Sequence, residues 1–153
     1  MEENTNLPSQ PAETLEPKWA TAKLVLGILS MVLFIVITFQ SCIVGLGNTL
    51  TDNGEVGGSF GFLIALNLLA SGIIAVAARK ATGKTAMIIA AVLLWLSFFL
   101  AKVFAGSYTD LTVWGFIAFA FGVVYLLSAA RTKKQTIITA VAAAVFLALM
   151  LIL

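Results

Sequence analysis

The sequence predicts an all-α membrane protein, a bundle of five transmembrane helices. Of its 153 residues, 61% are hydrophobic and only 10% are charged, whereas soluble domains are about 45–50% apolar and about 25% charged. The apolar residues also fall into five long runs that short polar segments separate. A chain this short cannot bury so much apolar surface in a water-soluble core, so lipid must cover the remainder.

The first 19 residues are predicted to form a disordered polar tail. They contain all three prolines and four of the seven acidic residues. Proline is excluded from helix interiors, and the tail has few apolar side chains to bury. Lys18 and Trp19 then mark a membrane interface, where a snorkelling amine and an amphipathic ring are both favourable.

Each of the five apolar runs has about the length that a transmembrane helix needs. About 20 residues, rising about 1.5 Å each, cross about 30 Å of hydrocarbon. Between the first two runs, Asn48–Ser59 is rich in Asp, Asn and Gly, and we expect a loop there. The predicted spans are 21–46, 60–78, 85–104, 113–130 and 136–153.

The last run leaves an alternative open. Its 18 residues carry no charge, and as a helix they are about 27 Å long. No charged side chain fixes their far end. If this helix lies in the interface, the protein has four spans.

Basic residues predict the orientation. Positive residues of short loops stay on the cytoplasmic side. With the N-terminus cytoplasmic, eight basic residues lie inside and only Lys102 lies outside, so the C-terminus is extracytoplasmic. Two basic segments then serve as topology anchors that also attract anionic lipid headgroups; their residues are Arg79, Lys80, Lys84, Arg131, Lys133 and Lys134.

Composition also argues against several function classes. The chain has no histidine and a single cysteine, Cys42, so metal sites of the His/Cys type and histidine-based catalysis are excluded within one chain. The predicted spans contain no carboxylate. We therefore expect no enzymatic activity and no cofactor, and the net charge of +2 gives no reason to expect nucleic-acid binding.

Two short motifs have a structural interpretation that we prefer. Gly83–Thr85 reads Gly-Lys-Thr, but Ala78 stands where a P-loop needs its first glycine. Cys42 follows Gln40 and Ser41, and it lies too far from the N-terminus for lipoprotein processing. Cys42 is better interpreted as a small buried residue in the outer half of the first span.

Four side chains are candidate intramembrane polar contacts: Gln40, Asn67, Ser97 and Lys102. An unpaired amide in hydrocarbon costs several kcal/mol, so we expect Asn67 to face the bundle. Counted from the basic ends of their helices, Asn67, Ser97 and Thr38 share a depth near mid-membrane. Lys102 is near the outer end of its span, within reach of Asp110.

Small residues recur at helical spacing in three spans and predict where helices pack closely, either within one chain or between chains. These positions are Gly61, Ala65 and Gly72, then Gly115, Ala118 and Gly122, and finally Ala140, Ala144 and Ala148.

Two segments, Phe39–Asn48 (FQSCIVGLGN) and Ser59–Lys80 (SFGFLIALNLLASGIIAVAARK), carry a family resemblance. The chain resembles small multi-spanning membrane proteins of Gram-positive bacteria. That group has no established activity, so the resemblance implies a bacterial plasma membrane and transfers no functional residue.

Two functional hypotheses follow from the sequence. The first is a non-enzymatic integral membrane protein that acts through lipids, a second copy of itself or another membrane protein. The second is a small transporter or channel subunit with a polar path near Gln40, Asn67 and Ser97. The absence of carboxylates and histidines from the spans favours the first, since coupled transport usually needs them.

Overall fold

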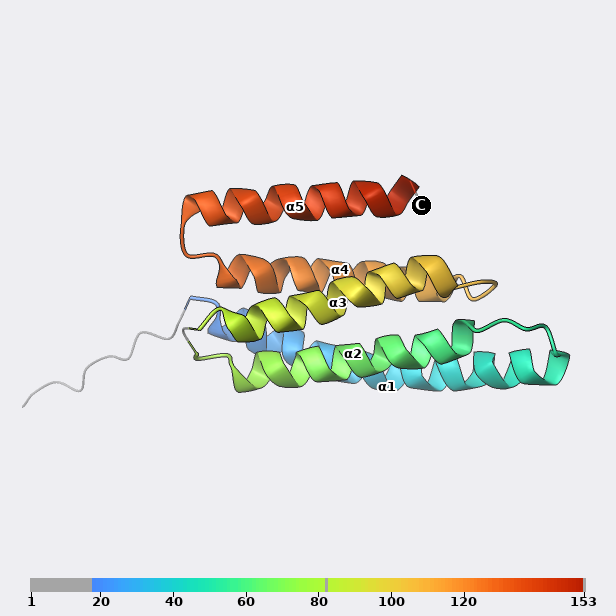
Figure 1. Ribbon diagram of the computed structural model, residues 1–153. Helices are drawn as coiled ribbons and strands as arrows, with labels where there is room; N and C mark the ends of the chain where they lie inside the picture. Colours follow the sequence, from blue (N-terminus) through green and yellow to red (C-terminus); the bar gives the residue numbers. More distant parts are fainter. Residues whose placement is uncertain (1–17, 82, 153) are drawn as a thin grey trace, which may run out of the picture.

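The computed structural model describes residues 18–81 and 83–152, and this part of the chain is an all-helical bundle. Consecutive helices run antiparallel, and α5 lies on the outside of the bundle beside α4 (Figure 1). All five helices are long and apolar enough to cross a membrane. They are α1 (Ala20–Thr51), α2 (Gly57–Ala77), α3 (Thr85–Phe104), α4 (Asp110–Ala129) and α5 (Lys133–Ile152).

Helix α1 extends five residues past its predicted end, because residues 47–51 remain helical. The expectation that the loop begins at Asn48 is therefore wrong. The hydroxyls of Thr49 and Thr51 donate to carbonyls one turn back, at 2.9 and 2.8 Å, and so stay compatible with the helix. The helix ends at Asp52, whose φ of 47° is left-handed. The other helix ends differ from the prediction by at most three residues, and the predicted tail lies almost wholly outside the described residues.

Glycine holds α1 and α2 together along their length. A Cβ added to Gly72 would lie 2.7 Å from the Gly27 carbonyl oxygen, and one added to Gly27 would lie 2.9 Å from the Gly72 carbonyl oxygen. Gly58 meets Gly45 as closely near the other end of the pair. In lipid such close backbone approach supplies most of the attraction between helices.

Helices α3 and α4 pack in the same way. Gly115 fits against Ala101 and Phe98, and Gly122 fits against the indole of Trp95. The two predicted small-residue seams in α2 and α4 are confirmed, since all six of their residues are buried.

The predicted seam of α5 is not used within the described chain. Ala140, Ala144 and Ala148 are exposed, and the buried residues of this helix are Ala143 and Met150. Phe146 and Leu147 complete the stripe that packs on the bundle. The indole of Trp95 stacks on Phe146 with ring centroids 4.9 Å apart. Helix α5 therefore packs through a stripe of residues three or four positions apart, with an aromatic contact at its centre, and its alanines at positions 140, 144 and 148 lie outside that stripe.

Candidate functional site

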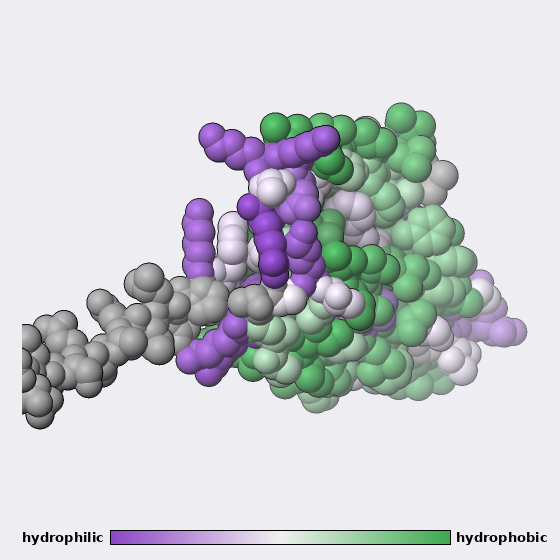
Figure 2. Space-filling model, turned by 60° about the vertical axis from the view of Figure 1, so that its left-hand side comes forward, coloured by the Kyte–Doolittle hydropathy of each residue, from purple (hydrophilic) through white to green (hydrophobic). Residues whose placement is uncertain are grey.

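The predicted topology anchors lie together at one end of the bundle, which we call the basic end. It contains the start of α1, the α2–α3 loop and the α4–α5 connection. Figure 2 shows hydrophilic residues gathered there and a mostly hydrophobic surface beyond them. The basic side chains in these segments are Lys18, Lys23, Arg79, Lys80, Lys84, Arg131, Lys133 and Lys134.

Some of these basic residues line a pocket of about 290 Å³ that we call the cationic pocket. It is open between the start of α1, the α2–α3 loop and the end of α4. The polar and aromatic groups around it are Lys18, Trp19, Lys23, Lys84, Ser128 and Arg131. Only 5% of Lys23 is exposed, which is unusual for a lysine. The sequence indicated Lys23 only as a marker of topology and did not predict that its side chain would be buried.

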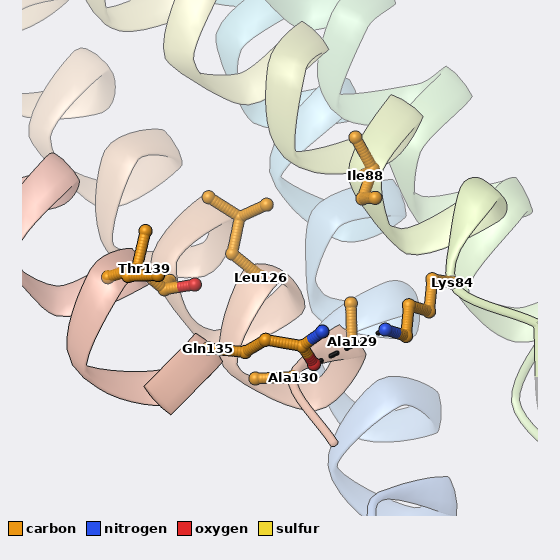
Figure 3. A pocket seen from close by; sticks show the side chains of 8 residues that line it. Lys84, Ile88, Leu126, Ala129, Ala130, Gln135 and Thr139 are labelled. Atoms are coloured by element: carbon orange, nitrogen blue, oxygen red, sulfur yellow. Dashed lines mark hydrogen bonds between the residues drawn. The ribbon is translucent and has the colours of Figure 1, made fainter. Parts of the chain in front are cut away.

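A second pocket of about 240 Å³, the α4–α5 groove, adjoins the cationic pocket and shares Lys84 and Ala129 with it. Figure 3 shows how its wall is built from the start of α3, the end of α4 and the start of α5. The Lys84 ammonium donates to the Gln135 side-chain oxygen at 3.2 Å, and that oxygen also accepts from the Arg131 backbone N–H at 2.9 Å. These two bonds fix the mouth of the groove.

Gln40, a predicted polar contact, joins three segments of the chain. Its side-chain oxygen accepts from the indole N–H of Trp114 at 2.8 Å and from the hydroxyl of Tyr108 at 3.2 Å. One residue thus links α1 to the α3–α4 loop and to α4. Sequence patterns could not reveal this partnership, because Gln40 is 68 positions from Tyr108 and 74 positions from Trp114, and only the fold brings it to them.

Asn67 and Ser97 do not share a hydrogen bond with Gln40 or with each other within residues 18–81 and 83–152. Ser97 donates to the Leu93 carbonyl of its own helix at 2.9 Å. The Asn67 amide nitrogen and the Thr38 hydroxyl are buried and have no partner in the described chain. A polar path through Gln40, Asn67 and Ser97 stays a prediction.

Lys102 lies in the last turn of α3 and is partly exposed. Among the residues that the structure describes, it forms no ion pair with Asp110. Cys42 is an exposed free thiol on α1, so the expectation that it is buried is wrong. Within the same residues there is no cluster of three or more His, Cys, Asp or Glu side chains that could hold a metal ion.

The opposite end of the bundle is closed by hydrogen bonds between its two loops. The Glu55 carboxylate accepts from the hydroxyl and from the backbone N–H of Ser107, the latter at 3.2 Å. Asn48 reaches across the α1–α2 loop and donates to the Glu55 carbonyl at 3.1 Å. The pKa of Tyr108 is raised above its ordinary value, mainly because its hydroxyl is buried and to a smaller extent because of the negative charge of Asp110.

Comparisons of the chain with protein-family models, with curated proteins and with solved structures give no match. Function must therefore be argued from the two ends of the bundle, from its buried polar groups and from the packing of α5.

Proposed function

We propose that this chain is a non-enzymatic integral membrane protein that acts by binding partners in the membrane. Its setting in this proposal is a bacterial plasma membrane, with the basic end cytoplasmic and the C-terminal end of α5 extracytoplasmic. Several polar side chains inside the helices support the proposal because hydrogen bonds within the bundle already satisfy them. Ser30, Ser71, Ser97 and Ser128 each donate to a carbonyl of their own helix, and Gln40 joins helices.

The observation that carries the proposal is the loose seating of α5. Among its described residues this helix buries only Ala143 and Met150, whereas α2 buries nine residues. Its packing stripe uses one face, and the alanines at positions 140, 144 and 148 are exposed elsewhere on the helix. A ridge of small residues at a spacing of four is the surface on which a second transmembrane helix packs closely.

The partner we propose for this ridge is α5 of a second copy of the chain. A two-fold dimer places the same surface of each subunit against itself. A ridge of alanines suits that arrangement, because it has no charge or bulky group that would meet its own copy unfavourably. Lipid alone would gain nothing from small residues at these positions.

Cysteine cross-linking in native membranes tests the dimer. In a Cys42→Ser background, Ala144→Cys is expected to give a covalent dimer under mild oxidation. Ile35→Cys, on an exposed face of α1, is the matched control and is expected to remain monomeric. Absence of the dimer with Ala144→Cys, or equal yields from both variants, would contradict the proposal.

The buried polar atoms of α1 and α2 favour a second candidate, a path for a small solute. Gly27 meets Gly72 and Gly45 meets Gly58, so in this antiparallel register Thr38 and Asn67 lie within about one turn of the same level. Both carry a buried polar atom with no partner in the described chain, and such atoms are costly unless something satisfies them.

Flux of glycerol and urea into proteoliposomes tests this candidate. A path that uses Asn67 is expected to conduct in the wild type and to lose most of its flux in Asn67→Leu. Equal flux at the background level in both proteins would refute it. Cross-linking at Ala144 does not depend on this result.

A further inference from the structure

We propose that the cationic pocket and the α4–α5 groove together bind one anionic phospholipid. The phosphate would lie in the pocket, and one acyl chain would lie in the groove. This inference concerns the basic end of the bundle and does not depend on dimerisation through α5.

The charges of the pocket select an anion. Lys18, Lys23, Lys84 and Arg131 line it, and no carboxylate among residues 18–81 and 83–152 does. The acidic residues of the described chain are Asp52, Glu55 and Asp110, and all three lie at the opposite end of the bundle. A site beside hydrocarbon also has a lower effective dielectric constant than open water, which strengthens attraction to a phosphate.

Lys23 is the residue whose charge an anionic ligand would stabilise most. It is 5% exposed, and its ammonium forms no hydrogen bond or ion pair with residues 18–81 and 83–152. The charge of a lysine whose side chain is packed so closely against the bundle is stabilised when an opposite charge accompanies it in the pocket. Trp19, which lines the same pocket, adds an indole N–H donor of the kind that phosphate oxygens accept.

The groove gives the site room for a chain. It continues from the cationic pocket through Lys84 and Ala129 (Figure 3). Through Ile138 it then meets an apolar pocket of about 590 Å³ between α5 and Trp95. Polar head and apolar groove therefore follow one another along the membrane normal, as the parts of a phospholipid do.

The length of this track fits one leaflet. Lys84 and Trp95 are 11 positions apart on α3, which corresponds to about 16 Å along the helix. Half of a hydrocarbon core of about 30 Å is about 15 Å. An acyl chain that starts at Lys84 would end near Trp95. An attraction of the basic end to the membrane surface alone would not require this groove.

Native mass spectrometry of the full-length protein tests the site. The protein, in an uncharged detergent, is mixed with equal amounts of dioleoyl phosphatidylglycerol and dioleoyl phosphatidylcholine, whose chains are identical. We expect one retained phosphatidylglycerol per chain, favoured about tenfold or more. Glycerol phosphate in large excess is expected not to displace it. Equal retention of the two lipids, or displacement by glycerol phosphate, would overturn the proposal.

Two charge-matched variants separate the pocket from the surface. Lys23→Gln with Lys84→Gln is expected to lower the retention of phosphatidylglycerol about tenfold or more. Lys133→Gln with Lys134→Gln removes the same charge from the same end, outside the pocket, and is expected to change it little. Equal losses from the two pairs would overturn the proposal. If the first pair misfolds, Lys23→Gln alone must lower retention and Lys23→Arg must preserve it.

A third pair tests the groove. Ile138 and Leu151 are similarly exposed on α5, at 58% and 60%, but only Ile138 lines the groove. Ile138→Trp is expected to weaken retention and Leu151→Trp to leave it unchanged; the reverse, or no difference, would contradict an acyl chain in the groove.

The acidic residues of the tail are the other anionic candidate for the pocket. A variant with glutamine at all four of them is therefore compared with the wild type; its substitutions are E2Q, E3Q, E13Q and E16Q. The proposal expects lipid selectivity in both proteins. Selectivity that emerges only in the variant would mean that the tail fills the pocket, and would overturn the proposal.

Discussion

Gln40 is a single amide that organises the end of the bundle opposite the basic residues. Its side-chain oxygen accepts two hydrogen bonds, from Trp114 and from Tyr108. The indole and phenol groups would otherwise lose hydrogen bonds on leaving water, and an unsatisfied buried donor costs about 1–3 kcal/mol. The polarity of Gln40 was enough to predict a contact between helices. It was not enough to predict that Trp114 and Tyr108 are the partners.

Replacing Gln40 with leucine removes the shared acceptor. We expect Gln40→Leu to lower the free energy of unfolding by about 1–3 kcal/mol, measured by thermal unfolding in detergent. Phe39→Leu is the control, because Phe39 is the neighbouring residue and is 68% exposed. Equal stability of the two variants would show that Gln40 does not hold these segments together.

Tyr108 predicts a loss of stability in alkaline solution. Burial, and after it the charge of Asp110, raises the pKa of Tyr108 above 10.0, so the folded state favours the neutral phenol. The associated stability is complete below the pKa of the unfolded chain and is lost as pH rises through the pKa of the folded state. Between about pH 8 and about pH 11, the temperature of thermal unfolding should therefore fall less steeply with pH in Tyr108→Phe than in the wild type. Identical slopes would contradict this assignment.

At the scale of the helices, glycine positions decide which faces meet. Gly27 and Gly72 bring the backbones of α1 and α2 together, and the aromatic stack of Trp95 on Phe146 brings α5 to the bundle. These are two different kinds of seam. The first depends on absent side chains and the second on large ones.

A pair of glycine substitutions tests the first seam. The Cβ of Gly72→Leu would start 2.7 Å from the Gly27 carbonyl oxygen, whereas a Cβ on Gly47 meets nothing within 4 Å. We expect Gly72→Leu to destabilise the protein by about 1–3 kcal/mol or more. Gly47→Leu should be neutral or slightly stabilising, because glycine is a poor helix former. A similar unfolding temperature for both variants would contradict the close packing of α1 on α2.

The helices themselves could be predicted because hydropathy and length determine them almost alone in a membrane protein. The seams in α2 and α4 could be predicted because glycine has little other reason to recur at helical spacing within a span. The seam of α5 could not, since alanine suits both a lipid-facing and a packed position. The extension of α1 to Thr51 was missed because Asn48, Thr49 and Thr51 are polar residues that also suit a loop. The Thr49 and Thr51 hydroxyls are satisfied within the helix, and Asn48 donates to the Glu55 carbonyl in the loop.

At the scale of the whole molecule, the described chain separates its charges along one axis. The basic residues other than Lys102 gather at one end, and Asp52, Glu55 and Asp110 lie at the other. The sequence predicted this separation. It did not predict the cationic pocket, because Lys23, Lys84 and Arg131 come from three helices or loops and converge only when those elements pack. A lipid site of this kind is a property of the assembled bundle.

The orientation of the bundle and the crossing of all five helices are tested most directly by labelling single cysteines in intact cells with a membrane-impermeant maleimide. In a Cys42→Ser background, the positions are Thr132 at the basic end, Thr109 at the opposite end and Ile152 at the end of α5. With the basic end cytoplasmic and five spans, Thr109→Cys and Ile152→Cys react from outside and Thr132→Cys reacts only after lysis. External labelling of Thr132→Cys would invert the orientation, and protection of Ile152→Cys until lysis would show that α5 does not cross the membrane.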